Sequence, residues 1–235
     1  MNLKFNYKNL IFLLIIISWI IINLQNRNSF NIILLNKLNN LIIIIILIII
    51  IFIIYINIFI IVNNFNNKIL IENNHIEIIW TFIPILIILF FSFPSIKILY
   101  LNNEIKSNII TIKIIRNQWF WYYEYLNFNN KFNSYIIYKQ NFNFNLIETD
   151  NRIIIPFNFP IQLILTSIDV IHSWTIPSIN IKIDCIPNQL NNFNIKCNKP
   201  NIIFGQCSEI CGINHRFIPI KIESINFNNF IKWLK

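Results

Sequence analysis

Cysteine, histidine and glycine are rare in this chain of 235 residues, yet they gather in one short run, GQCSEICGINH, at residues 205–215. Both glycines lie in this run, Cys207 and Cys211 lie between them, and His215 closes it. Another histidine, His172, lies upstream in DVIHSWTIPS. Two thiolates and two imidazoles suit a soft transition metal, either zinc or copper. The run therefore predicts a metal site.

The spacing of these ligands favours copper over zinc. A structural zinc site usually pairs two close cysteines with a second close pair of ligands, whereas His172 stands alone on a distant segment. A mononuclear blue copper site needs one cysteine and two histidines, so the second cysteine is surplus, and two thiolates are able to bridge two coppers. Taken alone, Cys-x3-Cys is more often a disulfide or a pair of small buried residues, and a lone histidine is more often a hydrogen-bonded core residue. Their combination makes a metal site the better interpretation.

Two apolar segments ahead of this region predict transmembrane helices. Residues 41–62 carry no charge, and residues 78–101 carry a single one, Lys97, near one end. Each segment is long enough to cross a hydrocarbon core of about 30 Å as a helix. Residues 24–104 are therefore expected to form an N-terminal segment and a transmembrane hairpin. A shorter apolar run within residues 1–23 is typical of a leader or of an additional helix.

The sequence changes character from residue 105 onward. Charges occur regularly, and short apolar or alternating runs are separated by Pro, Asn and Asp. Short strands at this spacing predict an all-β sandwich or barrel, and the last residues, NNFIKWLK, indicate one or two helical turns. The predicted fold class is a membrane α-helical hairpin followed by an all-β domain over residues 105–235.

The composition excludes some classes of protein. A net charge of +9 raises nucleic acid as a partner for a soluble protein, but the basic residues occur singly, so we interpret the charge as the solvated surface of a membrane protein. The excess of Ile and Asn and the absence of Ala indicate nucleotide bias in an AT-rich genome. The irregularly spaced cysteines do not predict a disulfide framework.

Five motifs, in chain order, resemble subunit II of the haem-copper cytochrome c oxidases: EIIWTFIPILIILFFSFPSIKILY, QWFWYYEY, ETDNR, DVIHSWTIPS and GQCSEICGINHRF. The likeness runs from about residue 24 to residue 235. It implies a cupredoxin-like Greek-key barrel behind two transmembrane helices. It also implies a binuclear copper centre that takes single electrons from cytochrome c and passes them to haem in the catalytic subunit, where oxygen is reduced to water. Subunits I and III and the lipid bilayer are the other implied partners.

The resemblance assigns the metal ligands. It implies that the thiolates of Cys207 and Cys211 bridge two copper ions and that the imidazoles of His172 and His215 complete the centre. The backbone carbonyl of Glu209 would contact one copper. Its side-chain carboxylate would bind magnesium, which prefers oxygen ligands, at the contact with the catalytic subunit.

The resemblance also assigns residues outside the metal site. Trp119 corresponds to the tryptophan through which electrons enter, and Glu124, Asp150 and Asp169 are candidates for docking the electron donor. Glu77 corresponds to an acid near a proton entrance of the catalytic subunit. A solvated charge at a helix start is an equally good interpretation of Glu77, because the helix dipole favours an acid there.

Ile218, Asn188 and two further cysteines depart from the family pattern. Ile218 occupies the place of an axial methionine, and because a hydrocarbon does not ligate copper, we expect copper to bind with a shifted reduction potential. Since Met occurs only at position 1 and many mitochondrial codes read AUA as Met, we hypothesise that the natural protein carries Met at position 218. Asn188 stands where the family has glycine and is expected in a left-handed turn. Cys185 and Cys197 match no family ligand and are expected to be small buried residues.

An alternative function is that of a membrane-anchored copper chaperone or thiol oxidoreductase, which also uses Cys-x3-Cys with a distant histidine. That class places a helix after the cysteines, whereas PIKIESI predicts a strand. A quinol-oxidase relative without copper is disfavoured, because all four ligands are present. The AT bias favours the mitochondrial inner membrane, with the β domain in the intermembrane space, and a bacterial plasma membrane is the alternative.

Overall fold

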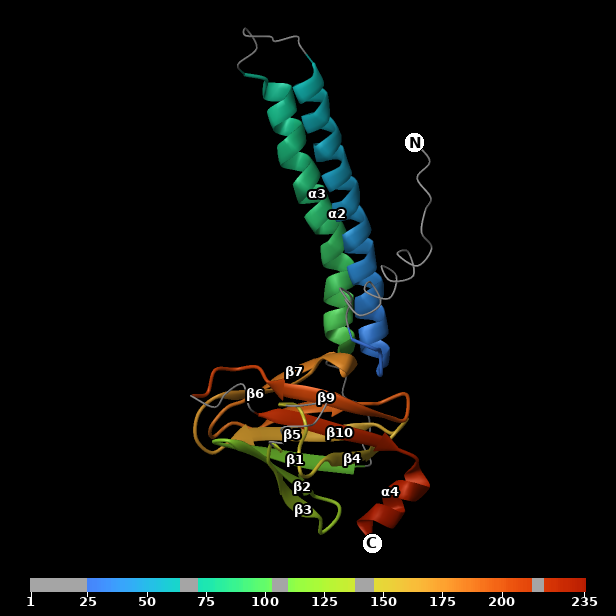
Figure 1. Cartoon of the computed structure of the whole chain (residues 1–235), viewed down its shortest axis with the longest axis vertical. Coiled ribbons are helices and arrows are strands. Elements are labelled where there is room, and N and C mark those ends of the chain that lie inside the picture. Colours follow the sequence, from blue (N-terminus) through green and yellow to red (C-terminus); the bar gives the residue numbers. More distant parts are fainter. Residues whose placement is uncertain (1–24, 64–71, 103–109, 138–145, 213–217) are drawn as a thin grey trace, which may run out of the picture. The chain divides into compact units, whose positions relative to one another are not determined.

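The computed structural model describes residues 25–63, 72–102, 110–137, 146–212 and 218–235. These residues form two compact units, of which one is a helical hairpin and the other is a β domain that also includes residues 25–29 (Figure 1). The predicted leader, residues 1–23, lies outside the described residues. The domain boundaries at residues 24 and 105 stay predictions.

Two long helices form the hairpin, α2 (Phe30–Val62) and α3 (Asn74–Asn102), and they pack alongside one another (Figure 1). Both are long and apolar enough to cross a membrane, and no residue in the most apolar stretch of either is buried within the protein. The Asn73 side chain begins α3 by accepting hydrogen bonds from the backbone N–H groups of His75 (3.1 Å) and Ile76 (3.3 Å). The prediction of two helices ahead of a β domain is confirmed.

The described part of the second unit contains ten strands in two five-stranded sheets (Figure 1). Their bounds are β1 Ile110–Asn117, β2 Phe120–Tyr125, β3 Lys131–Ser134, β4 Ile153–Pro156, β5 Ile161–Ser167, β6 His172–Ile176, β7 Ile181–Cys185, β8 Asn191–Ile195, β9 Asn201–Cys207 and β10 Pro219–Ile225. One sheet has the order β3-β2-β1-β5-β8 and the other the order β4-β10-β9-β6-β7. The predicted all-β, cupredoxin-like domain is thus confirmed.

Alternation along β1 explains how the first sheet buries its inner face. Ile110, Ile112 and Ile114 are buried, while the residues between them are half-buried. Successive side chains of a strand point to opposite faces, so every second residue of β1 enters the core. β1 lies at the centre of its sheet, antiparallel to β2 and parallel to β5.

The second sheet brings together two segments that are distant in the sequence. β6 pairs with β9 in antiparallel register, with Trp174 opposite Cys207 and Thr175 opposite Gln206. His172 begins β6 and Cys207 ends β9. The sheet therefore places the upstream histidine close to the first cysteine of the GQCSEICGINH run.

Asparagine takes turn positions that usually favour glycine. Asn158, Asn180 and Asn188 have φ angles of 64°, 59° and 60°, which lie in the left-handed region that Asn tolerates better than most residues. The expectation for Asn188 is confirmed. The C-terminal helix α4 (Phe227–Leu234) confirms the helical turns predicted for the tail, and it buries Phe230 against the β domain.

Candidate metal centre

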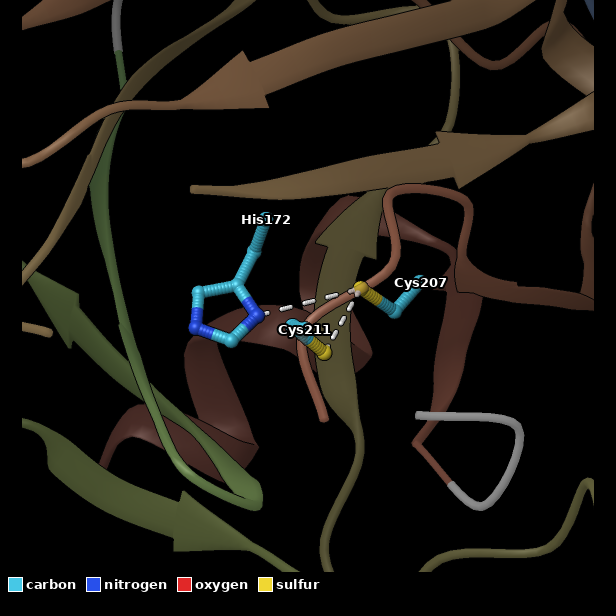
Figure 2. Close-up of side chains that lie close together, drawn as sticks. All are labelled: His172, Cys207 and Cys211. Atoms are coloured by element: carbon cyan, nitrogen blue, oxygen red, sulfur yellow. Dashed lines mark hydrogen bonds between the residues drawn. The ribbon is translucent and has the colours of Figure 1, made fainter. Parts of the chain in front are cut away.

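Three predicted ligands meet at one end of the β6–β9 pair. The Cys207 Sγ lies 4.0 Å from His172 Nδ1 and 3.9 Å from Cys211 Sγ, and the donor atoms of all three residues lie within 4.8 Å of one another. Figure 2 shows the imidazole and both thiols pointing toward one another. The residues are buried, with 0% of His172, 6% of Cys207 and 4% of Cys211 exposed. Two sulfurs and one imidazole nitrogen are a donor set that fits copper or zinc.

A carboxylate fixes the orientation of the histidine ring. His172 Nε2 lies 2.8 Å from Asp169 Oδ1, and because a carboxylate only accepts, Nε2 carries the proton and Nδ1 presents its lone pair toward the thiols. Asp169 also accepts hydrogen bonds from Gln118 N (2.6 Å), Val170 N (2.7 Å) and Ser167 Oγ (3.0 Å). Burial by itself would raise the pKa of the Asp169 carboxyl, but these hydrogen bonds, with that of His172 foremost, lower it overall.

Backbone hydrogen bonds hold the two cysteines. The Cys207 N–H donates to the Ile218 carbonyl at 3.1 Å, and the side-chain amide of Gln118 donates to the Cys211 carbonyl at 3.2 Å. The Cys207 thiol donates to the Glu209 carbonyl at 3.5 Å. The Glu209 carbonyl therefore faces the sulfur side of the cluster, and the buried Ile218 lies next to Cys207.

The Cys211 thiol holds its proton when no metal is bound. Burial, reinforced by the adjacent Cys207 and opposed by Arg116, raises the pKa of Cys211 to about 11. A metal that binds here must therefore displace protons, so its affinity depends on pH. None of the four cysteines forms a disulfide, and all four are buried, which confirms the expectation that Cys185 and Cys197 are small buried residues.

The predicted electron-entry residue lies beside the cluster. Trp119 is 43% exposed, and a Cβ on Gly212 would lie 3.7 Å from its indole nitrogen. Gly212 has a φ of 123°, a conformation that L side chains rarely adopt, and it directly follows Cys211. Trp119 thus contacts the loop that carries the second cysteine. The predicted second histidine, His215, lies outside the described residues.

Within the β domain, Glu124 and Asp150 are not part of the donor cluster. Glu124 lies opposite Lys113 and Lys131 in the first sheet, on strand β2, which begins at Phe120 directly after Trp119. Asp150 is exposed and accepts a hydrogen bond from the backbone N–H of Tyr135 at 2.7 Å. Glu77 lies in the first turn of α3, in the other unit.

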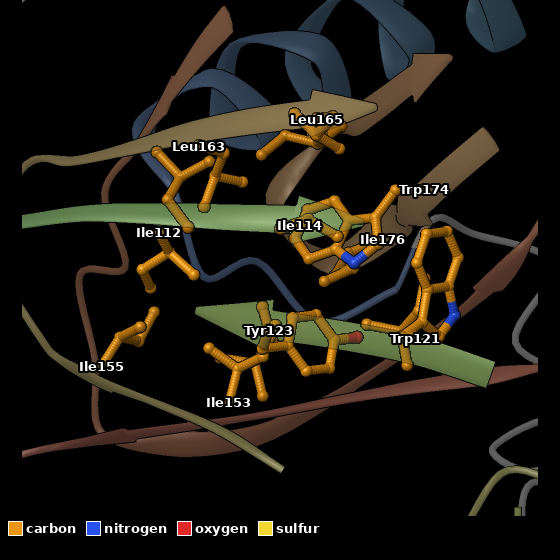
Figure 3. Close-up of a cluster of buried hydrophobic side chains, with 14 of the residues drawn as sticks. Ile112, Ile114, Trp121, Tyr123, Ile153, Ile155, Leu163, Leu165, Trp174 and Ile176 are labelled. Carbon is orange, nitrogen blue, oxygen red and sulfur yellow. The ribbon is translucent and has the colours of Figure 1, made fainter. Parts of the chain in front are cut away.

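A buried cation that the sequence analysis does not predict, Arg116, lies beside the thiols. Arg116 is 0% exposed, and its guanidinium lies 4.8 Å from the centroid of the Trp121 ring. Trp121 itself belongs to the hydrophobic core, together with Tyr123 and Trp174 (Figure 3). A signal was present, because Arg116 follows Ile112 and Ile114 at alternate positions of β1 and so occupies a core-facing place.

Comparison with known proteins finds matches to two domains of one protein family. Residues 110–225 match the periplasmic domain of cytochrome c oxidase subunit II, and residues 9–98 match the transmembrane domain of the same subunit.

Individual relatives agree with these matches. Cytochrome c oxidase subunit 2 of Apis mellifera ligustica is 48% identical over 219 residues, and that of Aedes aegypti is 46% identical over 221 residues. Each alignment covers 92% of this chain and 97% of the relative. The crystal structure of the periplasmic domain of subunit II of cytochrome oxidase from Bradyrhizobium japonicum is similar with a TM-score of 0.53 and 36% identity, over 56% of this chain and 94% of that one.

Proposed function

The chain belongs to the cytochrome c oxidase subunit II family and is a subunit of that oxidoreductase, and on this premise we propose that it is the subunit through which electrons enter. The single observation that carries the proposal is the cluster of His172, Cys207 and Cys211, whose donor atoms lie within 4.8 Å of one another. Copper held by the thiolates of Cys207 and Cys211 and by the imidazole of His172 would supply one-electron redox chemistry at this site.

Two of the proposed ligands are held in place by the hydrogen-bonded pair of strands β6 and β9. His172 and Cys207 are supplied by paired strands, and Asp169 holds the imidazole with Nδ1 toward the sulfurs. Such a hydrogen bond to a ligating histidine fixes its tautomer and raises its basicity. His215 would be the second imidazole. The Glu209 carbonyl, which already accepts from the Cys207 thiol, would contact one copper, and its carboxylate would bind magnesium.

We place the docking site for cytochrome c over Trp119. Exposed apolar side chains flank the ligands in the sequence: Ile168, Val170 and Ile171 precede His172, and Ile210 lies between the two cysteines. An apolar contact surface beside a partly exposed tryptophan suits a short electron path from a protein partner. Among the candidate docking acids, Asp169 is the one tied to this region, through its hydrogen bond from the Gln118 N–H. Glu124 and Asp150 would serve only at the rim of the contact.

The remaining assignments follow from membership of the family. Subunits I and III would be the membrane partners, and the electron would pass to haem in the catalytic subunit. Glu77 would lie near a proton entrance. The insect relatives favour the mitochondrial inner membrane, with residues 105–235 in the intermembrane space. A copper chaperone or thiol oxidoreductase is disfavoured, because a strand, β10, follows the cysteine motif.

Copper binding by the full-length chain in detergent tests the proposal. We expect Cys207→Ala to abolish stoichiometric copper binding, because it removes the sulfur that lies closest to both other donors. Cys197→Ala is the matched control, since Cys197 is equally buried in the same domain but is not part of the donor cluster. Retention of the full copper content by the Cys207→Ala chain would overturn the proposed site.

A further inference from the structure

Arg116 is a fully buried arginine for which the proposed electron-transfer centre offers a use. It lies near the end of β1, and its side chain faces the core. Its terminal nitrogen Nη1 donates a hydrogen bond to the Phe120 carbonyl. Its guanidinium carbon stands 4.8 Å from the centroid of the Trp121 ring. These two contacts hold the guanidinium in one place, so its charge is fixed rather than mobile.

The groups that act most strongly on this cation are the two cysteines of the proposed metal site. Gln118, two residues further along the chain, donates a hydrogen bond to the Cys211 carbonyl at 3.2 Å, which ties this end of β1 to the site. Within the part of the chain that the structure describes, Nε and Nη2 of Arg116 meet no nitrogen or oxygen acceptor. Burial lowers the pKa of Arg116, while Cys207 and Cys211, which would be thiolates in a metal-bound centre, oppose that shift. Cys211 also interacts with the guanidinium as a hydrogen-bond partner. An arginine remains protonated in proteins, so a positive charge stands beside the sulfurs.

A purely structural role explains this residue poorly. Burying a charge costs free energy, and an apolar side chain of similar volume often serves packing equally well or better. A buried charge serves a function, however, where a neighbouring group gains or loses charge. An electron that arrives at a nearby centre lowers the charge there by one unit, and a fixed cation stabilises the reduced state in a region of low dielectric.

We propose that Arg116 sets the reduction potential of the metal centre at Cys207 and Cys211 by holding a fixed positive charge beside the two sulfurs. The inference rests on the proposed function, because it requires a redox-active metal at these ligands. The charge makes the centre easier to reduce by its donor and lowers the driving force for passing the electron onward. It thereby adjusts how the total driving force is divided between the two steps.

The midpoint potential of the copper-loaded, full-length chain in detergent tests the inference. Arg116→Met and Arg116→Gln remove the charge, and two neutral variants are used because Met keeps an apolar stem whereas Gln keeps a donor for the Phe120 carbonyl. Arg116→Lys keeps the charge but loses the planar guanidinium. Lys113→Met is the control, since Lys113 lies on the same strand and the same charge is removed from the opposite face of the sheet.

We expect each neutral variant to lower the equilibrium constant for reduction about tenfold, which is about 59 mV for one electron. Arg116→Lys should stay within about threefold of the parent chain, and Lys113→Met should not differ from it. Unchanged potentials in the neutral variants, or equal shifts for Lys and Met at position 116, would overturn the inference. Loss of copper from both neutral variants, with retention by Arg116→Lys, would overturn the inference and would indicate instead that Arg116 is needed for copper to bind. A parent chain that bound no copper would instead overturn the proposed function, and this inference with it.

Discussion

Gly205 lies where β9 comes closest to the end of β6, and replacing it with alanine should disturb both the fold and the metal site. A Cβ at this position would lie 2.1 Å from the Thr175 carbonyl oxygen and 2.7 Å from Ile176 Cγ1. The nearest obstacle is backbone, which does not rotate away as a side-chain end does. The two strands must therefore separate, and these strands carry Cys207 and His172.

The magnitude follows from the contact distances. Real Cβ atoms essentially never approach a heavy atom closer than 3.0 Å, so the Thr175 carbonyl must retreat by roughly 1 Å. Overpacking of this kind costs about 1–3 kcal/mol. A binding constellation tolerates only about 0.5 Å of displacement, and the strand shift exceeds this at the 4.0 Å separation of His172 Nδ1 and Cys207 Sγ. We therefore expect Gly205→Ala to weaken copper affinity at least tenfold, which is about 1.4 kcal/mol.

Two measurements on the full-length chain in detergent check this prediction. Denaturant unfolding followed by tryptophan fluorescence gives the free energy of unfolding of the β domain, and competition with a chelator gives the copper affinity. Gln206→Ala is the control, because it introduces the same residue at the neighbouring, exposed position of β9 and should change stability by less than about 0.5 kcal/mol. A Gly205→Ala chain with the stability and copper affinity of its parent would refute the steric reasoning.

Three further predictions concern the pH dependence, the histidine ring and the axial position. Burial raises the pKa of Cys185 and of Cys197 to about 12, whereas an unfolded cysteine titrates near about 8.5. Above about pH 8.5 the unfolded metal-free chain therefore loses protons that the folded chain keeps, and its free energy of unfolding should fall by about 1.4 kcal/mol per pH unit for each cysteine. Cys197→Ala should reduce the slope by the share of one cysteine, about 1.4 kcal/mol per pH unit, and an unchanged slope would contradict the assignment. Asp169→Asn should weaken copper affinity about 10–100-fold, as measured by chelator competition, because it removes the carboxylate that orients His172; wild-type affinity would contradict that role. Mass spectrometry of the natural protein should find Met at position 218, and finding only the Ile218 peptide mass would end that hypothesis.

The ligands that lie in paired strands were predictable from the sequence because their residue types are rare. AT bias filled much of the chain with Ile and Asn, so Cys207, Cys211 and His172 stood out, and a strand before each of them indicated a common sheet. The register that brings His172 to Cys207 was not predictable, because it depends on Trp174 pairing with Cys207 across strands that are distant in the sequence.

The environment of the site was harder to predict than its ligands. The sequence predicts Asp169 as a docking acid but does not indicate its hydrogen bonds with His172 and Gln118, which give it a further role in orienting the ligand. The burial of Arg116 is not predicted, because a lone basic residue in a strand is usually solvated. Its alternation with Ile114 nevertheless indicates that its side chain faces the core. Helix α2 begins at Phe30, whereas the predicted span begins at residue 41, because polar residues such as Lys37 interrupt the apolar pattern between the two positions.

Copper content together with an electron paramagnetic resonance spectrum, both on the full-length chain, tests the central claim most directly. About two coppers per chain that share one unpaired electron are the predicted result, because in the proposed centre the thiolates of Cys207 and Cys211 would couple the two ions. One copper per chain with the spectrum of an isolated ion, or no copper at all, would contradict the electron-entry role.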